Sequence, residues 1–126
     1  MIRYDLPWPV RATLNHIYRH TGPVFLSEWA QLYRDLVLIE MRKFRQTLPE
    51  DGWLEVRITA YMPDKRRRDV ANLEKLLVDT IFAELGSDDT RISDLTLRKR
   101  WRKRGPPGIT VIIAPVAMQS DVTEGV

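Results

Sequence analysis

The amino-acid sequence predicts a single α+β or α/β domain in the order β-α-β-α-β-β, with two helices packed against a mixed sheet. Three observations predict this class. Alternation of apolar and polar residues, typical of half-buried strands, recurs near both ends of the chain and in its middle. Between these strands, two stretches carry apolar residues at helical spacing. The length of 126 residues suits one domain with its own core, which we assign to residues 1–117, followed by a flexible tail over residues 118–126.

The first half of the chain predicts a strand, a loop and a helix. Residues 2–8 alternate in character until prolines end the strand. Residues 10–25 mix polar and aromatic side chains without clear periodicity, which suits a long loop that contacts a ligand. A helix is then predicted from an N-cap at Ser27 to about Leu48. The apolar side of this helix consists of Leu32, Leu36, Ile39 and Phe44.

The second half predicts a strand, a helix and two further strands. Alternation returns over residues 53–62, and the order strand, helix, strand favours a right-handed crossover with parallel pairing. The second helix is expected over residues 72–85, with Gly86 as its C-terminal stop. The last two strands are expected at residues 92–103 and 109–114, joined as a hairpin by a Gly-Pro-Pro-Gly turn.

The second helix has more apolar surface than one core-facing stripe requires. Val78, Phe82 and Leu85 widen that stripe, and a monomer of this size would struggle to bury them. An oligomer would help a short chain to cover such a surface. We therefore expect a homodimer in which a partner subunit contacts this helix.

Positive charge is concentrated in one part of the chain. The net charge is only +3 and the isoelectric point is near 9.4, yet twelve of the twenty lysines and arginines lie between Lys65 and Arg104. This distribution favours a polyanionic partner. The absence of cysteine excludes disulfides and cysteine-ligated zinc, and it permits a reducing compartment. Because no apolar run could span a bilayer and no signal peptide opens the chain, we expect a cytoplasmic protein without membrane contact.

The most unusual segment runs from Asp64 to Lys75 and reads Asp-Lys-Arg-Arg-Arg-Asp-Val-Ala-Asn-Leu-Glu-Lys. Four adjacent cations are tolerated where they stay solvated or where an anion such as phosphate neutralises them. Asp69 follows them directly, and a carboxylate at a phosphate site is the ligand that a bound divalent cation requires. The alternative is a solvated basic turn in which Asp69 caps the next helix.

A second basic region lies in the strand that follows. Six of the seven residues from Arg98 to Arg104 are basic. Alternation in a strand would leave Leu95, Leu97, Lys99 and Trp101 on one face and place four arginines on the other, namely Arg98, Arg100, Arg102 and Arg104. This row matches a phosphate backbone. Its alternative role is to protect an edge strand from aggregation.

The segment from Met62 to Lys75 resembles the RusA family of Holliday-junction resolvases, and the resemblance extends over about residues 4–113. The matching residues outside this segment are Leu6-Pro7-Trp8-Pro9, Tyr18-Arg19-His20 and Asp88-Asp89. The core motif of that family reads Asp-x-Asp-Asn-x-x-Lys, and its two acids join a later aspartate in binding magnesium. This chain departs from the motif at Ala71, which stands where the second acid should be.

The resemblance implies a site. Magnesium, or manganese in its place, would be held by Asp69 and Asp89, with Asp88 as the close alternative to Asp89. Lys75 would reach a phosphate and take part in catalysis, one helical turn beyond Ala71. Without the resemblance, the pair Asp88-Asp89 would be interpreted as a turn cap and Lys75 as a solvated lysine. The side chains expected to bind DNA are Tyr18, Arg19, His20, Lys65, Arg66, Arg67, Arg68, Arg98, Arg100 and Arg102.

The resulting expectation is a homodimeric, magnesium-dependent endodeoxyribonuclease that resolves four-way junctions and other branched DNA by paired cleavage, without a small-molecule cofactor. Ala71 would impair cleavage, and because the other motif positions are intact, the pattern favours an engineered substitution over natural decay. The alternative from another class is a non-catalytic nucleic-acid-binding module. A further enzymatic alternative is a metal-dependent nuclease with no preference for junctions.

Overall fold

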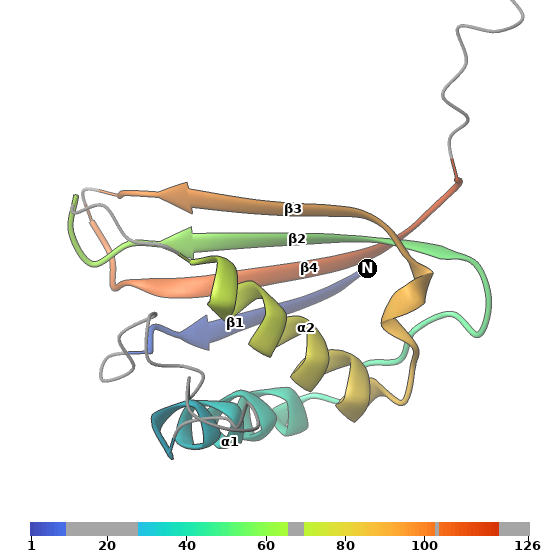
Figure 1. The fold of residues 1–126 in the computed structure, drawn as a ribbon, viewed down its shortest axis with the longest axis horizontal. Helices are drawn as coiled ribbons and strands as arrows, with labels where there is room; N and C mark the ends of the chain where they lie inside the picture. The colour runs from blue at the N-terminus through green and yellow to red at the C-terminus, as the bar shows by residue number, and fades with distance from the viewer. Residues whose placement is uncertain (10–27, 66–69, 103, 119–126) are drawn as a thin grey trace, which may run out of the picture.

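The computed structural model contains the elements in the predicted order, with one added turn of 3-10 helix (Figure 1). It describes residues 1–9, 28–65, 70–102 and 104–118, apart from the side chains of Trp29 and Ala71. The elements are β1 (Ile2–Pro7), α1 (Glu28–Lys43), β2 (Trp53–Tyr61), α2 (Ala71–Leu85), the 3-10 helix η2 (Asp89–Arg91), β3 (Ile92–Arg100) and β4 (Gly108–Val116). The predicted α+β class is confirmed, whereas residues 119–126 of the predicted tail lie outside the described residues.

The four strands form one mixed sheet in the order β1-β4-β2-β3. β2 and β3 are parallel, and β4 runs antiparallel to both of its neighbours. The predicted hairpin between the last two strands is therefore wrong, because β2 lies between them. Burial explains the order: Ile109, Val111 and Ile113 of β4 are each 1% exposed, as a central strand requires, whereas the charged β3 is suited to an edge.

The predicted parallel crossover forms between β2 and β3, not between the first two strands. β1 and β2 point the same way but are separated by β4. The parallel partners of β2 and β3 extend from Leu54 and Ile92 to Tyr61 and Arg100, with α2 as the connection. This crossover places the end of β3 beside the end of β2, where the basic motif begins.

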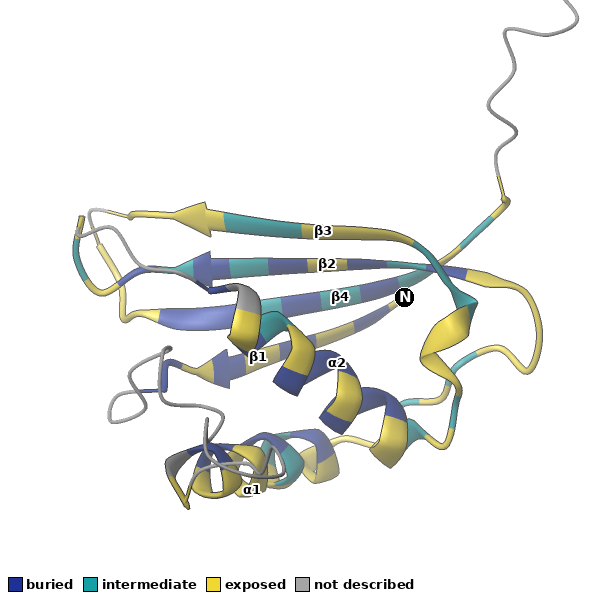
Figure 2. Cartoon of the chain, in the orientation of Figure 1, coloured by how far each residue is buried: buried dark blue, intermediate teal, exposed yellow. Residues whose placement is uncertain are grey.

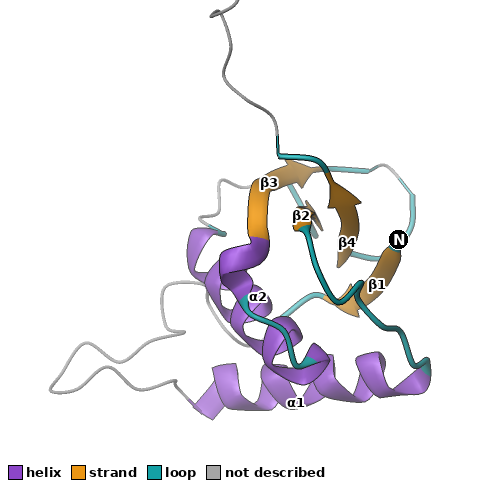
Figure 3. Ribbon diagram, turned by 90° about the vertical axis from the view of Figure 1, so that its right-hand side faces the viewer, coloured by secondary structure: helices purple, strands orange, loops and turns teal. Residues whose placement is uncertain are grey.

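Both helices lie on one face of the sheet, and no helix of the described residues covers the other face, which we call the uncovered face (Figure 3). Buried residues alternate with more exposed ones along β1 and β2 (Figure 2). Because successive strand residues lie on opposite faces, the buried ones belong to the face that the helices cover. The largest fully buried side chains include Leu54, Ile58, Leu73, Leu77, Ile81, Ile109 and Ile113. The core therefore fills the space between the sheet and the two helices.

The side of α1 that faces the core is not the side that the apolar pattern indicated. Its buried residues are Ala30, Tyr33, Val37 and Met41. The predicted apolar side is exposed, with Leu32 at 53%, Leu36 at 48%, Ile39 at 55% and, beyond the helix end, Phe44 at 75%. Tyr33 can be buried because its hydroxyl donates to the carbonyl oxygen of Pro7 at 2.6 Å. The helix also ends at Lys43, before the predicted Leu48.

α2 packs beside α1, and its wide apolar surface lies inside the chain's own core. Val78 is 7% exposed and Phe82 is 2% exposed, so the prediction that a partner subunit must cover these residues is wrong. The predicted stop is confirmed: Gly86 adopts a left-handed conformation with φ 67°, and its amide donates to the carbonyl of Ala83.

The two edges of the sheet differ. At β1, the side-chain amide of Gln46 accepts from the N–H of Arg3 at 3.3 Å and donates to its carbonyl at 3.2 Å. Gln46 thus occupies part of this edge as a further strand would. Among the described residues, no strand pairs with the outer edge of β3. Neither α1 nor α2, the helices of the described chain, is long and apolar enough to cross a membrane.

Candidate nucleic-acid interface and acidic residues

One end of the sheet brings the basic motif and the basic strand together. β1, β2 and β3 end there, and β4 and α2 begin there (Figure 1). The N–H of Met62 donates to the carbonyl of Arg100 at 2.8 Å, which ties the exit of β2 to the exit of β3. Carboxyl ends of parallel strands are where sites in open sheets gather. We call this region the motif end, and it comprises residues 61–65, 70–75 and 98–102.

The arginines of β3 lie on the uncovered face of the sheet. Arg98 and Arg100 are the cross-strand partners of Thr59 and Tyr61, which alternate with the buried residues of β2. The guanidinium of Arg102 lies over the ring of Tyr61, 4.2 Å from the ring centroid. The predicted alternation is found for Arg98 and Arg100, but β3 ends at Arg100, before the predicted end at residue 103, so Arg102 and Arg104 lie beyond the strand. Contact of these arginines with DNA stays a prediction.

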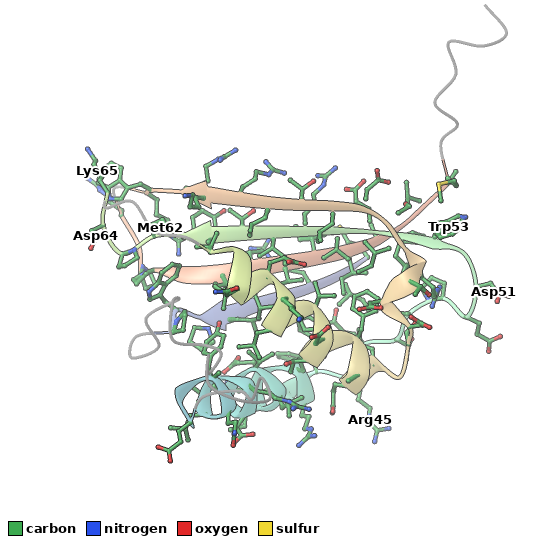
Figure 4. All side chains as sticks on the ribbon, viewed as in Figure 1. Arg45, Asp51, Trp53, Met62, Asp64 and Lys65 are labelled. Carbon is green, nitrogen blue, oxygen red and sulfur yellow. The ribbon has the colours of Figure 1, made fainter. Side chains whose placement is uncertain are left out.

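The loop after β2 contacts the exit of β3. Asp64 and Lys65 lie at the motif end, whereas Asp51 and Trp53 lie at the opposite end of the sheet (Figure 4). The ammonium of Lys65 lies over the ring of Trp101, 4.2 Å from its centroid. The attraction between a cation and an aromatic face holds the first cation of the basic motif against the β3 exit.

The second part of the motif begins α2. Val70 is the N-cap of this helix, it is buried, and its side chain makes no capping hydrogen bond. The positive end of the helix dipole therefore lies at the motif end. Lys75, one turn beyond Ala71, has an exposed side chain. Burial and then the charge of Asp79 raise the pKa of the neighbouring Glu74, although Lys75 opposes this shift.

Seven predicted site residues lie outside the described part of the chain: Tyr18, Arg19, His20, Arg66, Arg67, Arg68 and Asp69. Lys65 and Val70, which flank residues 66–69 in the sequence, are described, and both belong to the motif end. Of Ala71 only the backbone is described, as the first residue of α2. The roles of these residues stay predictions.

The acidic pair lies beyond the far end of α2. Asp88 is the N-cap of η2, and its Oδ1 accepts from the N–H of Thr90 at 2.8 Å. Hydrogen bonds from Thr90 hold the pKa of Asp88 below its usual value. Asp88 therefore acts as a turn cap, the alternative that the sequence left open. Asp89 begins η2 with an exposed side chain, which makes it the better candidate for a metal ligand.

Arg91 holds the acidic turn in place, and the sequence analysis missed it. Its Nε donates to the carbonyl of Gly52 at 3.0 Å, its Nη2 to that of Pro49 at 2.8 Å, and its Nη1 to Ser87 Oγ at 2.9 Å. The bonds to Gly52 and Pro49 attach η2 to the loop that precedes β2, and the bond to Ser87 attaches it to the turn after α2. The only sequence signal was a lone arginine two residues after the acidic pair, within a half of the chain that is rich in cations.

The motif end and the acidic turn are separated by the length of α2. The helix has 15 residues and is therefore about 22 Å long at roughly 1.5 Å per residue. Protein ligands of one magnesium ion each lie about 2.1 Å from it. Within the described residues, no group of three or more His, Cys, Asp or Glu side chains could hold a metal ion. A single chain therefore does not bring Asp89 to the motif end.

The fold and these residues define a class: a small α+β protein with a positively charged sheet end suited to a polyanion. A family model described as Endodeoxyribonuclease RusA matches residues 7–114. The chain belongs to the RusA family of endodeoxyribonucleases, which confirms the resemblance of its motifs.

Several curated relatives share about a third of their residues with this chain. The crossover junction endodeoxyribonuclease RusA of Shigella sonnei strain Ss046 is 34% identical over 96 residues, which is 75% of this chain and 78% of the relative. The protein of the same name from Escherichia coli strain K12 gives the same values. That of Enterobacteria phage 82 is 35% identical over 99 residues, again 75% of this chain and 78% of the relative.

Proposed function

We propose that this chain is a structure-specific endodeoxyribonuclease that acts on four-way junctions and other branched DNA by paired phosphodiester cleavage. The observation that carries the proposal is its membership of a family whose relatives are named crossover junction endodeoxyribonucleases. The cations of the motif end support it, because they suit a phosphate backbone. A DNA substrate also supports the cytoplasmic location.

Cleavage of this kind would use a divalent metal ion, magnesium or manganese, with Asp69 and Asp89 as protein ligands. When bound, such an ion supplies an activated water and stabilises the charge of the phosphate that is cut. Asp88 is the weaker candidate, since its Oδ1 already accepts from the amide of Thr90. The residues of one chain do not fit one ion, because α2 separates Asp89 from the motif end.

A homodimer would remove this mismatch. The motif end and Asp89 lie at opposite ends of α2 and of β3. A twofold axis through the middle of these elements would therefore place the motif end of each chain beside Asp89 of the other chain. Leu95, in the middle of β3, is 45% exposed and belongs to the edge that no described strand pairs. Each composite site would take Asp69 from one chain and Asp89 from the other, and two such sites fit paired cleavage.

The chain's own cations would bind and orient the phosphate. The N-terminal amides of α2 lie at the motif end, and Lys75 follows one turn along the same helix. Arg100 and Arg102 extend the positive surface onto the uncovered face of the sheet. These groups would offset negative charge on the phosphate, most of all as that charge develops in the transition state.

Ala71 predicts slow cleavage by this chain. A methyl group cannot ligate magnesium, so the site loses one hard oxygen ligand and one negative charge. DNA binding would be retained, because the cations of the motif end carry it. The missing acid also favours the second candidate function, a non-catalytic module that binds branched nucleic acid.

A cleavage assay separates the two functions. The chain and its Ala71→Asp variant are incubated with magnesium or manganese and with four-way, flapped and linear duplexes of matched sequence. We expect the variant to cut branched DNA and the parent chain to bind it with little cleavage. A variant that cuts nothing with any divalent metal would refute the nuclease, and equal cutting of linear duplex would refute the preference for branches.

A further inference from the structure

The exit of β3 carries an exposed tryptophan among its cations. Trp101 follows the last residue of β3, is 47% exposed, and has exposed arginines on both sides in sequence, Arg100 and Arg102. An isolated exposed apolar residue is ordinary on a protein surface. The ring of Trp101, however, is held in a specific arrangement at the motif end.

Two segments hold this ring. Lys65, from the loop that carries the basic motif, places its ammonium 4.2 Å from the ring centroid. The backbone bond from the N–H of Met62 to the carbonyl of Arg100 fixes the two chain segments that carry these side chains. The ring is therefore oriented before any ligand arrives, with a cation over its face. Because Trp101 is 47% exposed, part of its surface is accessible to a second flat group.

The other described aromatic residues of this region do not offer such a surface. Trp8 is 8% exposed and belongs to the core. Tyr61 is half-buried, and the guanidinium of Arg102 covers its ring while donating to the carbonyl of Pro106. Tyr61 and Arg102 thus fix the turn between β3 and β4, and Trp101 remains as the accessible ring.

We propose that Trp101, with Lys65 over its ring, is a stacking site for an unpaired nucleobase at the branch point of DNA, an inference that rests on the proposed function. Every nucleobase has a flat face that stacks on an aromatic ring regardless of sequence. Bases inside an uninterrupted duplex already stack on both sides, whereas a branch point or flap leaves a base with a free face. The neighbouring cations would hold the backbone of the same nucleotide.

The stacked base would set the position of the branch point relative to the motif end. Stacking would determine which phosphate is presented to the acidic residues, and the cations would supply most of the affinity. Loss of the ring should therefore weaken the binding of branched DNA and reduce the quenching of base fluorescence. The salt dependence of binding should change little, because no phosphate contact is removed.

The test uses binding in the absence of metal, so that no DNA is cut. A four-way junction and a single-stranded oligonucleotide carry 2-aminopurine, the first at the branch point, and quenching of its fluorescence reports stacking. Trp101→Leu removes the aromatic face but keeps an apolar side chain, and Trp101→Phe keeps a ring. Phe44→Ala is the control, because Phe44 is 75% exposed and its neighbour Arg45 lies far from Lys65 (Figure 4).

We expect the parent chain, Trp101→Phe and Phe44→Ala to quench both probes. Trp101→Leu should lose the quenching and bind the junction about ten-fold more weakly, with an unchanged salt slope. Equal quenching and affinity in Trp101→Leu would overturn the stacking site. The single-stranded probe distinguishes the two proposals. If the chain does not prefer branched DNA, the proposed function is refuted. If the same chain still quenches this probe through Trp101, the stacking site is supported.

Discussion

Ala71 is the first residue of α2, and Asp89 is the first residue of the 3-10 helix beyond the other end of α2. The position of the missing acid and the best candidate for the later acid are therefore separated by a helix of 15 residues. This relationship separates the two positions in a single chain by about 22 Å at roughly 1.5 Å per residue. The acidic site that we propose would therefore be formed by two chains, which can be tested by mixing variants.

In the Ala71→Asp background, Asp69→Asn and Asp89→Asn chains should each be inactive alone and regain cleavage when co-expressed. A mixed dimer has one site with both substitutions and one site with neither, so it should nick one strand of a labelled junction. Each single variant should bind junctions within a few-fold of the parent affinity, because removing negative charge near a phosphate does not weaken electrostatic attraction.

The outcome identifies where each acid acts. Without recovery in the co-expressed mixture, the shared site between subunits would be refuted. If either variant alone cuts at the parent rate, its acid is a turn cap and not a ligand.

Leu95→Glu should dissociate the proposed dimer, and Leu36→Glu should not. The two leucines are similarly exposed, at 45% and 48%, but only Leu95 lies on the β3 edge between the two halves of the proposed site. A carboxylate buried without a partner in an interface is strongly destabilising. Analytical ultracentrifugation measures the association state, and dissociation by Leu36→Glu alone would place the interface on α1.

Replacing Arg98, Arg100 and Arg102 by serine should weaken DNA binding and flatten its dependence on salt. Each neutralised phosphate contributes about 0.9 to the slope of log affinity against log salt for duplex DNA. Loss of up to three contacts should therefore lower the slope by up to about 2.7. Titrations at several salt concentrations measure it, with a thermal melt to confirm folding. An unchanged slope would indicate that DNA contacts Arg66, Arg67 and Arg68 instead.

Tyr33→Phe should lower the free energy of unfolding by about 0.5–1.5 kcal/mol, because it removes a buried hydrogen bond to the carbonyl of Pro7. The control is Leu36→Ala on the exposed side of α1, which should change stability by less than about 0.5 kcal/mol. Urea unfolding of both variants measures the difference. A larger loss for Leu36→Ala would mean that the originally predicted side of α1 faces the core.

The strands could be predicted from the sequence where the alternation of apolar and polar residues alone identifies a strand. Alternation identified residues 2–8 and 53–62, because each of these strands has one face toward the helices. The order of strands in the sheet was not predictable from alternation, since it depends on which strand can remain charged at an edge. The core side of α1 was also missed, because this helix is apolar on two sides and the partner of the Tyr33 hydroxyl lies 26 residues away.

The elements that carry the residues of the motif end were easier to predict than the distances between them. The position of Lys75 on α2 and the alternation of the β3 arginines follow from helix and strand periods. A motif names candidate ligands but gives no distances between them, so the separation of Asp89 from the motif end emerged only with the length of α2. The anchoring role of Arg91 depends on three partners spread between Pro49 and Ser87, which no local pattern connects.

The most direct test of the account is cleavage of a plasmid that extrudes a cruciform, which contains a four-way junction, by the Ala71→Asp dimer with magnesium. Paired cuts across the junction convert the supercoiled plasmid to a linear product, whereas a single cut leaves a nicked circle. The account predicts linear product from Ala71→Asp and little or none from the parent chain. Nicked circles alone, or equal cutting of a plasmid without the cruciform, would contradict paired cleavage of a junction.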